Sequence, residues 1–227
     1  MRMLVVSAAL GMLAGAACAQ DAFTAKVTID SPTAHRVADN ANVVVWLTPL
    51  SGDPAPVVPK HATLAQHNKQ FEPHMVVIPV GSTIDFPNKD PFFHNVFSLY
   101  KGKRFDLGLY EAGKSRTVHF DQSGVSFIFC NIHPEMSAVV VALPTPYYGI
   151  SNAAGEISIP DVPPGRYRMQ TWYERSSSDA LAGDARDITI PAESAIVLHV
   201  RQTVEGAVAH KNKYGKDYDK SNEPYHQ

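Results

Sequence analysis

Four side chains in this sequence form a possible donor set for a redox metal ion. Cys130, His133 and Met136 stand within the seven-residue stretch CNIHPEM, and His94 lies 36 positions before the cysteine. Two imidazole nitrogens, one thiolate sulfur and a weak axial thioether are the ligands of a copper ion that transfers single electrons. The spacing therefore predicts one type 1 copper ion bound by His94, Cys130, His133 and Met136.

Each of these ligands also has a simpler interpretation. A Cys-x-x-His pair is often a chance occurrence, and most methionines fill a hydrophobic core. Zinc is the alternative metal, but methionine is a poor zinc ligand, and zinc sites prefer cysteine and histidine throughout. The single cysteine of the mature chain, the upstream run PFFHN and the order of the ligands together favour copper.

The segments that carry the ligands must meet at one end of a β-structure. Residues 125–129 are predicted to form a strand that ends at Cys130, and residues 96–99 a second strand beside His94. The 36-residue separation allows His94 to lie on a different loop at the same end of a sandwich. Pro134 has a fixed φ and no N–H, so it limits rearrangement of the loop. A rigid site would change little between the two oxidation states of copper.

Short strands separated by turn residues are predicted along the whole chain, and no segment keeps a 3.6-residue period over three turns. The proline-rich residues 48–60 indicate a linker or long turn, and the polar residues 175–184 indicate a loop. The fold class is therefore predicted to be all-β, and a sandwich is expected. The other predicted strands are residues 23–29, 41–47, 62–66, 75–79, 83–86, 115–120, 137–143, 157–160, 166–174, 185–190 and 195–200.

The first 19 residues have the features of a secretory signal peptide. Arg2 supplies a positive charge, the apolar stretch after it is too short to span a bilayer, and Ala17-Cys18-Ala19 is a small-x-small cleavage site. Cys18 could instead be a lipoprotein anchor, but Gly15 stands where such a signal usually has leucine. We expect an exported, periplasmic product that begins at Gln20 and has no transmembrane segment.

Composition limits the function further. The chain has 227 residues, of which 44% are hydrophobic, and a formal net charge of -2. This length is enough for one large or two small domains, and the charge offers no bulk basic field for nucleic acid. Once the signal peptide is removed, Cys130 is the only cysteine, so it cannot form an internal disulfide in an oxidising compartment. It is either a buried inert residue or protected by something bound to it.

Residues 61–142 resemble a cupredoxin, a Greek-key β-sandwich that binds copper. The C-x-x-H-x-x-M loop, with proline after the histidine, is similar in length to that of amicyanin, and His94-Asn95-Val96 and residues 75–86 match the same pattern. The resemblance implies the four ligands named above, and it implies that Asn95 ties the two ligand loops together by hydrogen bonding. For an electron carrier we expect a small docking face for redox partner proteins, formed by Phe92, Phe93, Pro134 and Glu135. Glu135 departs from the amicyanin pattern, which has an aromatic residue there, so the surface around His133 is expected to be less apolar than in the family.

Residues 152–174 resemble a second family, the carboxypeptidase regulatory-like (transthyretin-like) β-sandwich. The residues that match its pattern are Gly155, Ile157, Ile159, Val162, Pro163, Pro164, Gly165 and Tyr167. Residues 23–47 are similar to the first strands of that family, so we expect the cupredoxin to be inserted in this sandwich. The alternative is one enlarged cupredoxin with extra strands at both ends. The predicted organisation is a signal peptide (1–19), a discontinuous second sandwich (20–57 and 144–205), a cupredoxin domain (61–142) and a polar tail (206–227).

The sequence thus leads to the hypothesis of a periplasmic carrier of single electrons that is not an enzyme. One alternative is a protein that binds copper and passes the ion on, although only three of the six methionines lie beyond the signal peptide. The other alternative is an assembly module of a periplasmic complex. No His-x-His pair occurs, so a trinuclear oxidase centre has no ligands. His210 and His226, in the basic tail, are expected to be solvated.

Overall fold

The computed structural model describes residues 22–31, 39–52, 56–99, 102–203 and 210–218. Within these ranges the chain forms short β-strands and one seven-residue helix, so the all-β prediction is confirmed. The predicted signal peptide and residues 206–209 and 219–227 of the predicted tail lie outside the described residues. No helix in the described ranges is long and apolar enough to cross a membrane.

Two sheets enclose one hydrophobic core, which we call the flanking sandwich. Every second side chain of its first strand, from Phe23 to Ile29, points into this core, as expected for a half-buried strand. The sheet orders are β14-β1-β17 and β13-β2-β15-β16. The strands are β1 (Phe23–Asp30), β2 (Val44–Pro49), β13 (Tyr148–Ile150), β14 (Glu156–Ile159), β15 (Gly165–Trp172), β16 (Arg186–Ile190) and β17 (Ala195–Arg201).

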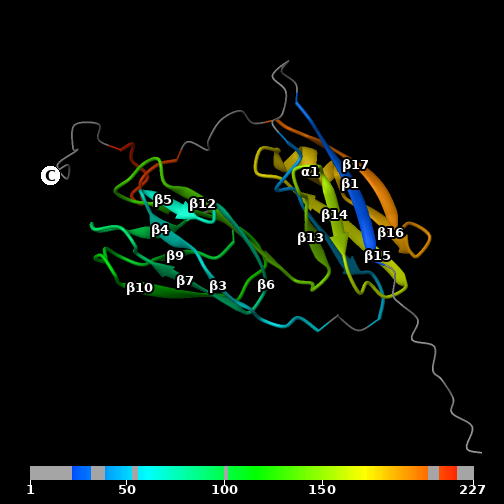
Figure 1. The fold of residues 1–227 in the computed structure, drawn as a ribbon, viewed down its shortest axis with the longest axis horizontal. Helices are drawn as coiled ribbons and strands as arrows, with labels where there is room; N and C mark the ends of the chain where they lie inside the picture. Colours follow the sequence, from blue (N-terminus) through cyan, green and yellow to red (C-terminus); the bar gives the residue numbers. More distant parts are fainter. Residues whose placement is uncertain (1–21, 32–38, 53–55, 100–101, 204–209, 219–227) are drawn as a thin grey trace, which may run out of the picture.

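A second pair of sheets encloses a separate core, which we call the centre sandwich. Its sheet orders are β10-β7-β3 and β6-β12-β11-β8-β9, and β4 and β5 form a short hairpin beside them. The chain passes through all of these strands between β2 and β13, and Figure 1 shows the two sandwiches side by side. The strands are β3 (His61–Thr63), β4 (Ala65–His67), β5 (Gln70–Glu72), β6 (Met75–Pro79), β7 (Ser82–Pro87), β8 (Val96–Ser98), β9 (Phe105–Asp106), β10 (Ser115–Phe120), β11 (Gly124–Cys130) and β12 (Ser137–Leu143).

Strand β12 explains why the two sandwiches pack together. Six of its seven residues are buried, because one face points into the centre sandwich and the other faces the flanking sandwich. Such a strand appears in the sequence as a continuous apolar run rather than an alternating one. The cluster between the sandwiches, which we call the interface cluster, consists of Val44, Val139, Val141, Leu143 and Trp172.

Several local predictions differ from the structure. The predicted strand at residues 41–47 begins only at Val44, and Asn42 adopts a left-handed φ of 66° that a strand does not allow. The predicted strand at 62–66 is divided into β3 and β4 by Leu64, whose side chain is fully buried. The predicted loop at 175–184 contains helix α1 (Ser178–Asp184), whose first turn is capped by the Ser177 hydroxyl.

Candidate metal centre

Two paired strands bring the distant ligand segments together. Cys130 is the last residue of β11, and it lies opposite Val96 at the start of β8. His94 stands two residues before β8, where its backbone is held by two hydrogen bonds with Tyr110. The ladder between β11 and β8 therefore places His94 and Cys130 at the same end of the centre sandwich.

Three of the four predicted ligands converge on one point. The Cys130 Sγ atom lies 3.5 Å from Nδ1 of His94 and 3.5 Å from Nδ1 of His133, and the two Nδ1 atoms are 3.2 Å apart. A triangle with these sides has its centre about 2.0 Å from each corner, and metal–nitrogen and metal–sulfur bonds in proteins are about 2.0 to 2.3 Å. The three donors therefore fit a single metal ion.

Met136 closes the loop that carries Cys130 and His133. Its N–H donates to the His133 carbonyl (3.1 Å), and its carbonyl accepts from the Cys130 N–H (3.3 Å). Its side chain is buried in the same core cluster as Cys130. These contacts bring the thioether into the ligand loop, and its role as an axial ligand stays a prediction.

A buried carboxylate that the sequence analysis missed determines the state of His94. Asp90 accepts a hydrogen bond from His94 Nε2 at 2.8 Å, and both side chains are almost fully buried. Asp90 also accepts the backbone N–H groups of Asn68 and Lys69. Since Nε2 carries the proton in this pair, the Nδ1 lone pair points toward the metal position. The only sign of this pair in the sequence is the aspartate four residues before His94, in the run DPFFH.

Burial controls the protonation of the donors. It lowers the pKa of His94, and Asp90 opposes this only in part. Burial and the neighbouring His94 lower the pKa of His133 to about 4. Burial raises the pKa of the Cys130 thiol, against the effect of the backbone N–H groups of Asn95, Ile132 and His133. Both imidazoles are thus neutral donors at neutral pH, and binding of a metal ion would release the thiol proton.

No protein-family model matches the chain, and no curated protein matches it. Matches to solved structures cover part of the chain. A purple cupredoxin from Nitrosopumilus maritimus is 24% identical over 36% of this chain and 99% of its own, with a TM-score of 0.33. A reduced amicyanin variant is 19% identical over 36% and 80%, with a TM-score of 0.34. The Cu-containing nitrite reductase of Thermus scotoductus is 22% identical over 42% of this chain and 25% of its own, with a TM-score of 0.35. These structural neighbours are cupredoxins.

In the centre sandwich, Asn95 joins the ligand segments through its main chain. The Asn95 carbonyl accepts from the N–H of Asn131, the residue after Cys130, at 2.9 Å. The Asn95 side-chain amide turns elsewhere and donates to Asp106 at 2.7 Å. A link between the two ligand loops is therefore present, and it depends on backbone groups that any residue at position 95 would carry.

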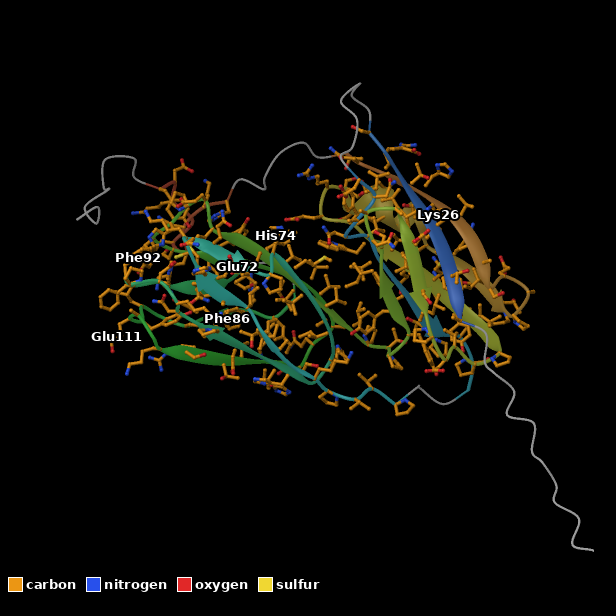
Figure 2. The ribbon with its side chains drawn as sticks, in the orientation of Figure 1. Lys26, Glu72, His74, Phe86, Phe92 and Glu111 are labelled. Carbon is orange, nitrogen blue, oxygen red and sulfur yellow. The ribbon has the colours of Figure 1, made fainter. Side chains whose placement is uncertain are left out.

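The predicted docking residues surround the one ligand that reaches the surface. His133 is half-buried, and the Phe92 ring packs against both His94 and His133 with 5.4 Å between ring centroids. Phe93 is 50% exposed, and Pro134 and Glu135 are also exposed. Figure 2 shows Phe92 at the end of the centre sandwich that points away from the flanking sandwich. Two further exposed apolar side chains, Ile132 on the ligand loop and Leu109, were not predicted.

Part of the predicted polar tail also reaches the centre. The described residues 210–218 contact the residues beside the Cys130 ligand, and the His210 ring stacks on Phe129 with 3.9 Å between centroids. The expectation that His210 is a solvated histidine is therefore wrong. Contacts between residues more than 80 positions apart leave no local pattern in the sequence, so this packing could not be predicted.

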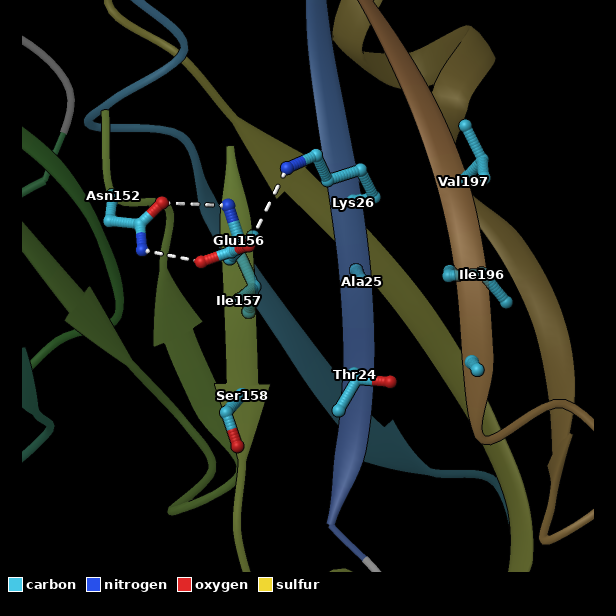
Figure 3. A pocket seen from close by; sticks show the side chains of 10 residues that line it. Thr24, Ala25, Lys26, Asn152, Glu156, Ile157, Ser158, Ile196 and Val197 are labelled. Atoms are coloured by element: carbon cyan, nitrogen blue, oxygen red, sulfur yellow. Dashed lines mark hydrogen bonds and ion pairs between the residues drawn. The ribbon is translucent and has the colours of Figure 1, made fainter. Parts of the chain in front are cut away.

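A surface hollow on the β14-β1-β17 sheet has different chemistry (Figure 3). Lys26 and Glu156 form an ion pair there at 3.6 Å, and Asn152 holds the Glu156 carboxylate at 3.1 Å. The residues that line it include neither histidine nor cysteine. The hollow therefore offers no set of metal donors, unlike the end of the centre sandwich.

Proposed function

We propose that this protein binds one type 1 copper ion and carries single electrons between redox partner proteins in the periplasm. The observation that carries the proposal is the triangle of Cys130 Sγ and the two histidine Nδ1 atoms, with sides of 3.2 to 3.5 Å. Bound copper would supply a one-electron couple between Cu(II) and Cu(I). The proposal includes the domain organisation predicted from the sequence. It also includes that the protein is not an enzyme.

The residues of the chain are arranged to hold the donors in advance. Asp90 fixes the ring of His94 and its tautomer. The backbone N–H groups of Asn95, Ile132 and His133 stabilise negative charge on Cys130 Sγ. Because these groups are already in place, the ligands need little rearrangement when the charge of the site changes.

The burial of the site favours an electron carrier over a protein that passes the ion on. His94 and Cys130 are fully buried and Met136 is almost so, while His133, against which the Phe92 ring packs, is the one predicted ligand that reaches the surface. Exchange of an ion requires open ligands, whereas an electron can pass through the edge of a partly exposed imidazole. The exposed apolar side chains around His133 suit the small, weak interfaces of redox proteins.

A copper titration tests the proposal. Cu(II) added to the full-length protein is expected to give an intense thiolate charge-transfer band near ~600 nm at one equivalent. The band should be absent in Cys130→Ser and unchanged in His119→Gln, which alters an exposed histidine of the same sandwich. A weak band that survives in Cys130→Ser would show that Cys130 is not a copper ligand, and zinc or an assembly role would then be preferred.

A further inference from the structure

The described part of the C-terminal segment packs against the strand end that carries the cysteine ligand. Residues 210–218 contact three consecutive residues there, although the two regions lie more than 80 positions apart in the sequence. The contacts are a hydrogen bond from Tyr218 Oη to the Cys130 carbonyl (2.8 Å), a hydrogen bond from Lys213 N–H to Asn131 Oδ1 (2.9 Å), and the stacking of His210 on Phe129.

The same segment is also connected, through Asp106, to Asn95, the residue after the ligand His94. Lys213 Nζ lies 2.8 Å from one oxygen of Asp106, and the other oxygen of Asp106 accepts the Asn95 amide at 2.7 Å. Burial alone would raise the pKa of Asp106, but its hydrogen bonds with Lys213 and Asn95 hold that pKa below its ordinary value. The Lys213 side chain is only 18% exposed, so this ion pair is partly shielded from water. The segment thus connects with both ligand loops.

The segment has a defined shape of its own. Asn212 Oδ1 accepts the N–H groups of Tyr214 and Lys216, and the Asn212 N–H donates to the Lys216 carbonyl. Gly215 completes this turn with a left-handed φ of 74°, which glycine adopts without steric cost. The turn fixes the direction of Lys213 relative to the chain on either side.

The chain before the segment is held by the flanking sandwich. The N–H of Thr203 donates to the Arg175 carbonyl at 2.8 Å, and the Thr203 hydroxyl accepts from the Ser177 N–H. Seven positions later His210 lies on Phe129 in the centre sandwich. The covalent chain therefore joins a fixed point of one sandwich to the ligand strand of the other.

We propose that residues 210–218 act as a clamp that holds Cys130 and Asn131 in position and thereby retains the metal ion. This inference rests on the proposed function, because it assigns a role to the clamp at the same site. Tyr218 and Lys213 are positioning residues: they hold the backbone and the neighbour of the ligand and do not touch the metal position. The Cys130 carbonyl and the Asn131 side chain are the groups through which the clamp acts.

The test uses the full-length protein with Tyr218→Phe and Lys213→Ala. Lys216→Ala and Asp217→Asn are matched controls in the same segment, because both of those side chains are exposed. Lys213→Arg keeps a cation opposite Asp106 and should restore most of the effect of Lys213. The first readout, made without metal, is the hydrogen exchange of the backbone amides of Cys130 and Asn131. The second is the rate at which a chelator removes Cu(II), followed through the thiolate band.

Loss of one hydrogen bond is expected to speed both amide exchange and copper removal by about 2- to 10-fold, while the two controls match the wild type. Unchanged exchange in both Tyr218→Phe and Lys213→Ala would overturn the clamp. Faster exchange with unchanged copper removal would also overturn it, since the segment would then stabilise the loop without retaining the metal. If the wild-type protein gave no thiolate band, the proposed function would fail, and the exchange readout would still decide whether the segment holds Cys130 and Asn131.

Discussion

The two sandwiches are built from the same strand pattern and differ in what they bury. In the described residues, the core of the flanking sandwich is apolar, and the polar side chains buried around it, such as Ser151 and Thr171, carry no charge. The centre sandwich buries Asp90, His94 and the Cys130 thiol at one end. A buried ionisable group costs free energy unless it is paired, and Asp90 and His94 are paired with each other at the end of the sandwich where Cys130 also lies.

The comparison also shows how a site can be rigid without a disulfide. The flanking sandwich depends on packing, whereas the ligand end of the centre sandwich depends on a hydrogen-bonded network around Asp90, Asn95 and Asp106. Substitutions in the first should change stability and spare the metal site. Substitutions in the second should change metal binding more than folding.

The largest effect on stability is expected in the flanking core. Met169→Ala removes a fully buried side chain and should lower the free energy of unfolding by about 2–5 kcal/mol in a denaturant titration. The copper absorbance per folded molecule should stay the same, because no ligand lies in this core. Val197→Ala, at a position 62% exposed on β17, is the control and should have little effect. A loss of the copper band in folded Met169→Ala would contradict the division of roles.

The next effect is expected at the buried carboxylate. Asp90→Asn removes the negative charge that holds His94 Nε2–H, and copper affinity should fall by about 10- to 100-fold in a competition titration. Asp187→Asn, which changes an exposed ion pair of the flanking sandwich, should leave the affinity unchanged. Equal affinity in wild type and Asp90→Asn would mean that the carboxylate does not position His94.

A smaller effect is expected between the sandwiches. Val141 is buried in the interface cluster, and Val141→Ala should lower the free energy of unfolding by about 1–2 kcal/mol because two methyl groups lose their contacts. The same substitution at Val58, which is 72% exposed, should cost almost nothing. If Val141→Ala also left stability unchanged, the packing of the two sandwiches would contribute nothing to folding.

The smallest effect concerns a pH-dependent pair between the sandwiches. His74 Nε2 lies 2.8 Å from Glu174, and this hydrogen bond raises the pKa of His74 against the opposing effect of burial and the weaker one of Arg175. Figure 2 shows His74 on the side of the centre sandwich that faces the flanking sandwich. Because the folded protein binds this proton more tightly than the unfolded chain does, the stabilisation is complete below pH 6.5 and disappears as the pH rises through the raised pKa.

His74→Gln should therefore lower stability by about 0.2–1 kcal/mol at acidic pH, with a small size because the pair is partly exposed. At alkaline pH the variant and the wild type should unfold at the same denaturant concentration. A difference for His74→Gln that grew toward alkaline pH would have the wrong sign and would exclude the pair as its cause.

Features that depend on residues close together in the sequence were predicted, whereas contacts between residues far apart in the sequence were not. Residues 115–120 were predicted with their observed bounds, because the buried Val118 and Phe120 stand on either side of the exposed His119 and give a period of two. The donor set was predicted from residue types and spacing, and the structure brings three of its members together. Asp90 was missed because an aspartate before a proline is also typical of a turn. The contacts of Lys213 and Tyr218 were missed because nothing in their own neighbourhood specifies Asn131 or Cys130.

A redox titration of the copper-loaded protein, followed at the thiolate band, tests the central claim most directly. For an electron carrier, the band should disappear on reduction with a one-electron slope and return in full on reoxidation over repeated cycles, even with a Cu(I) chelator present. Loss of copper to the chelator on the first reduction would contradict the electron-carrier function and favour a protein that passes the ion on.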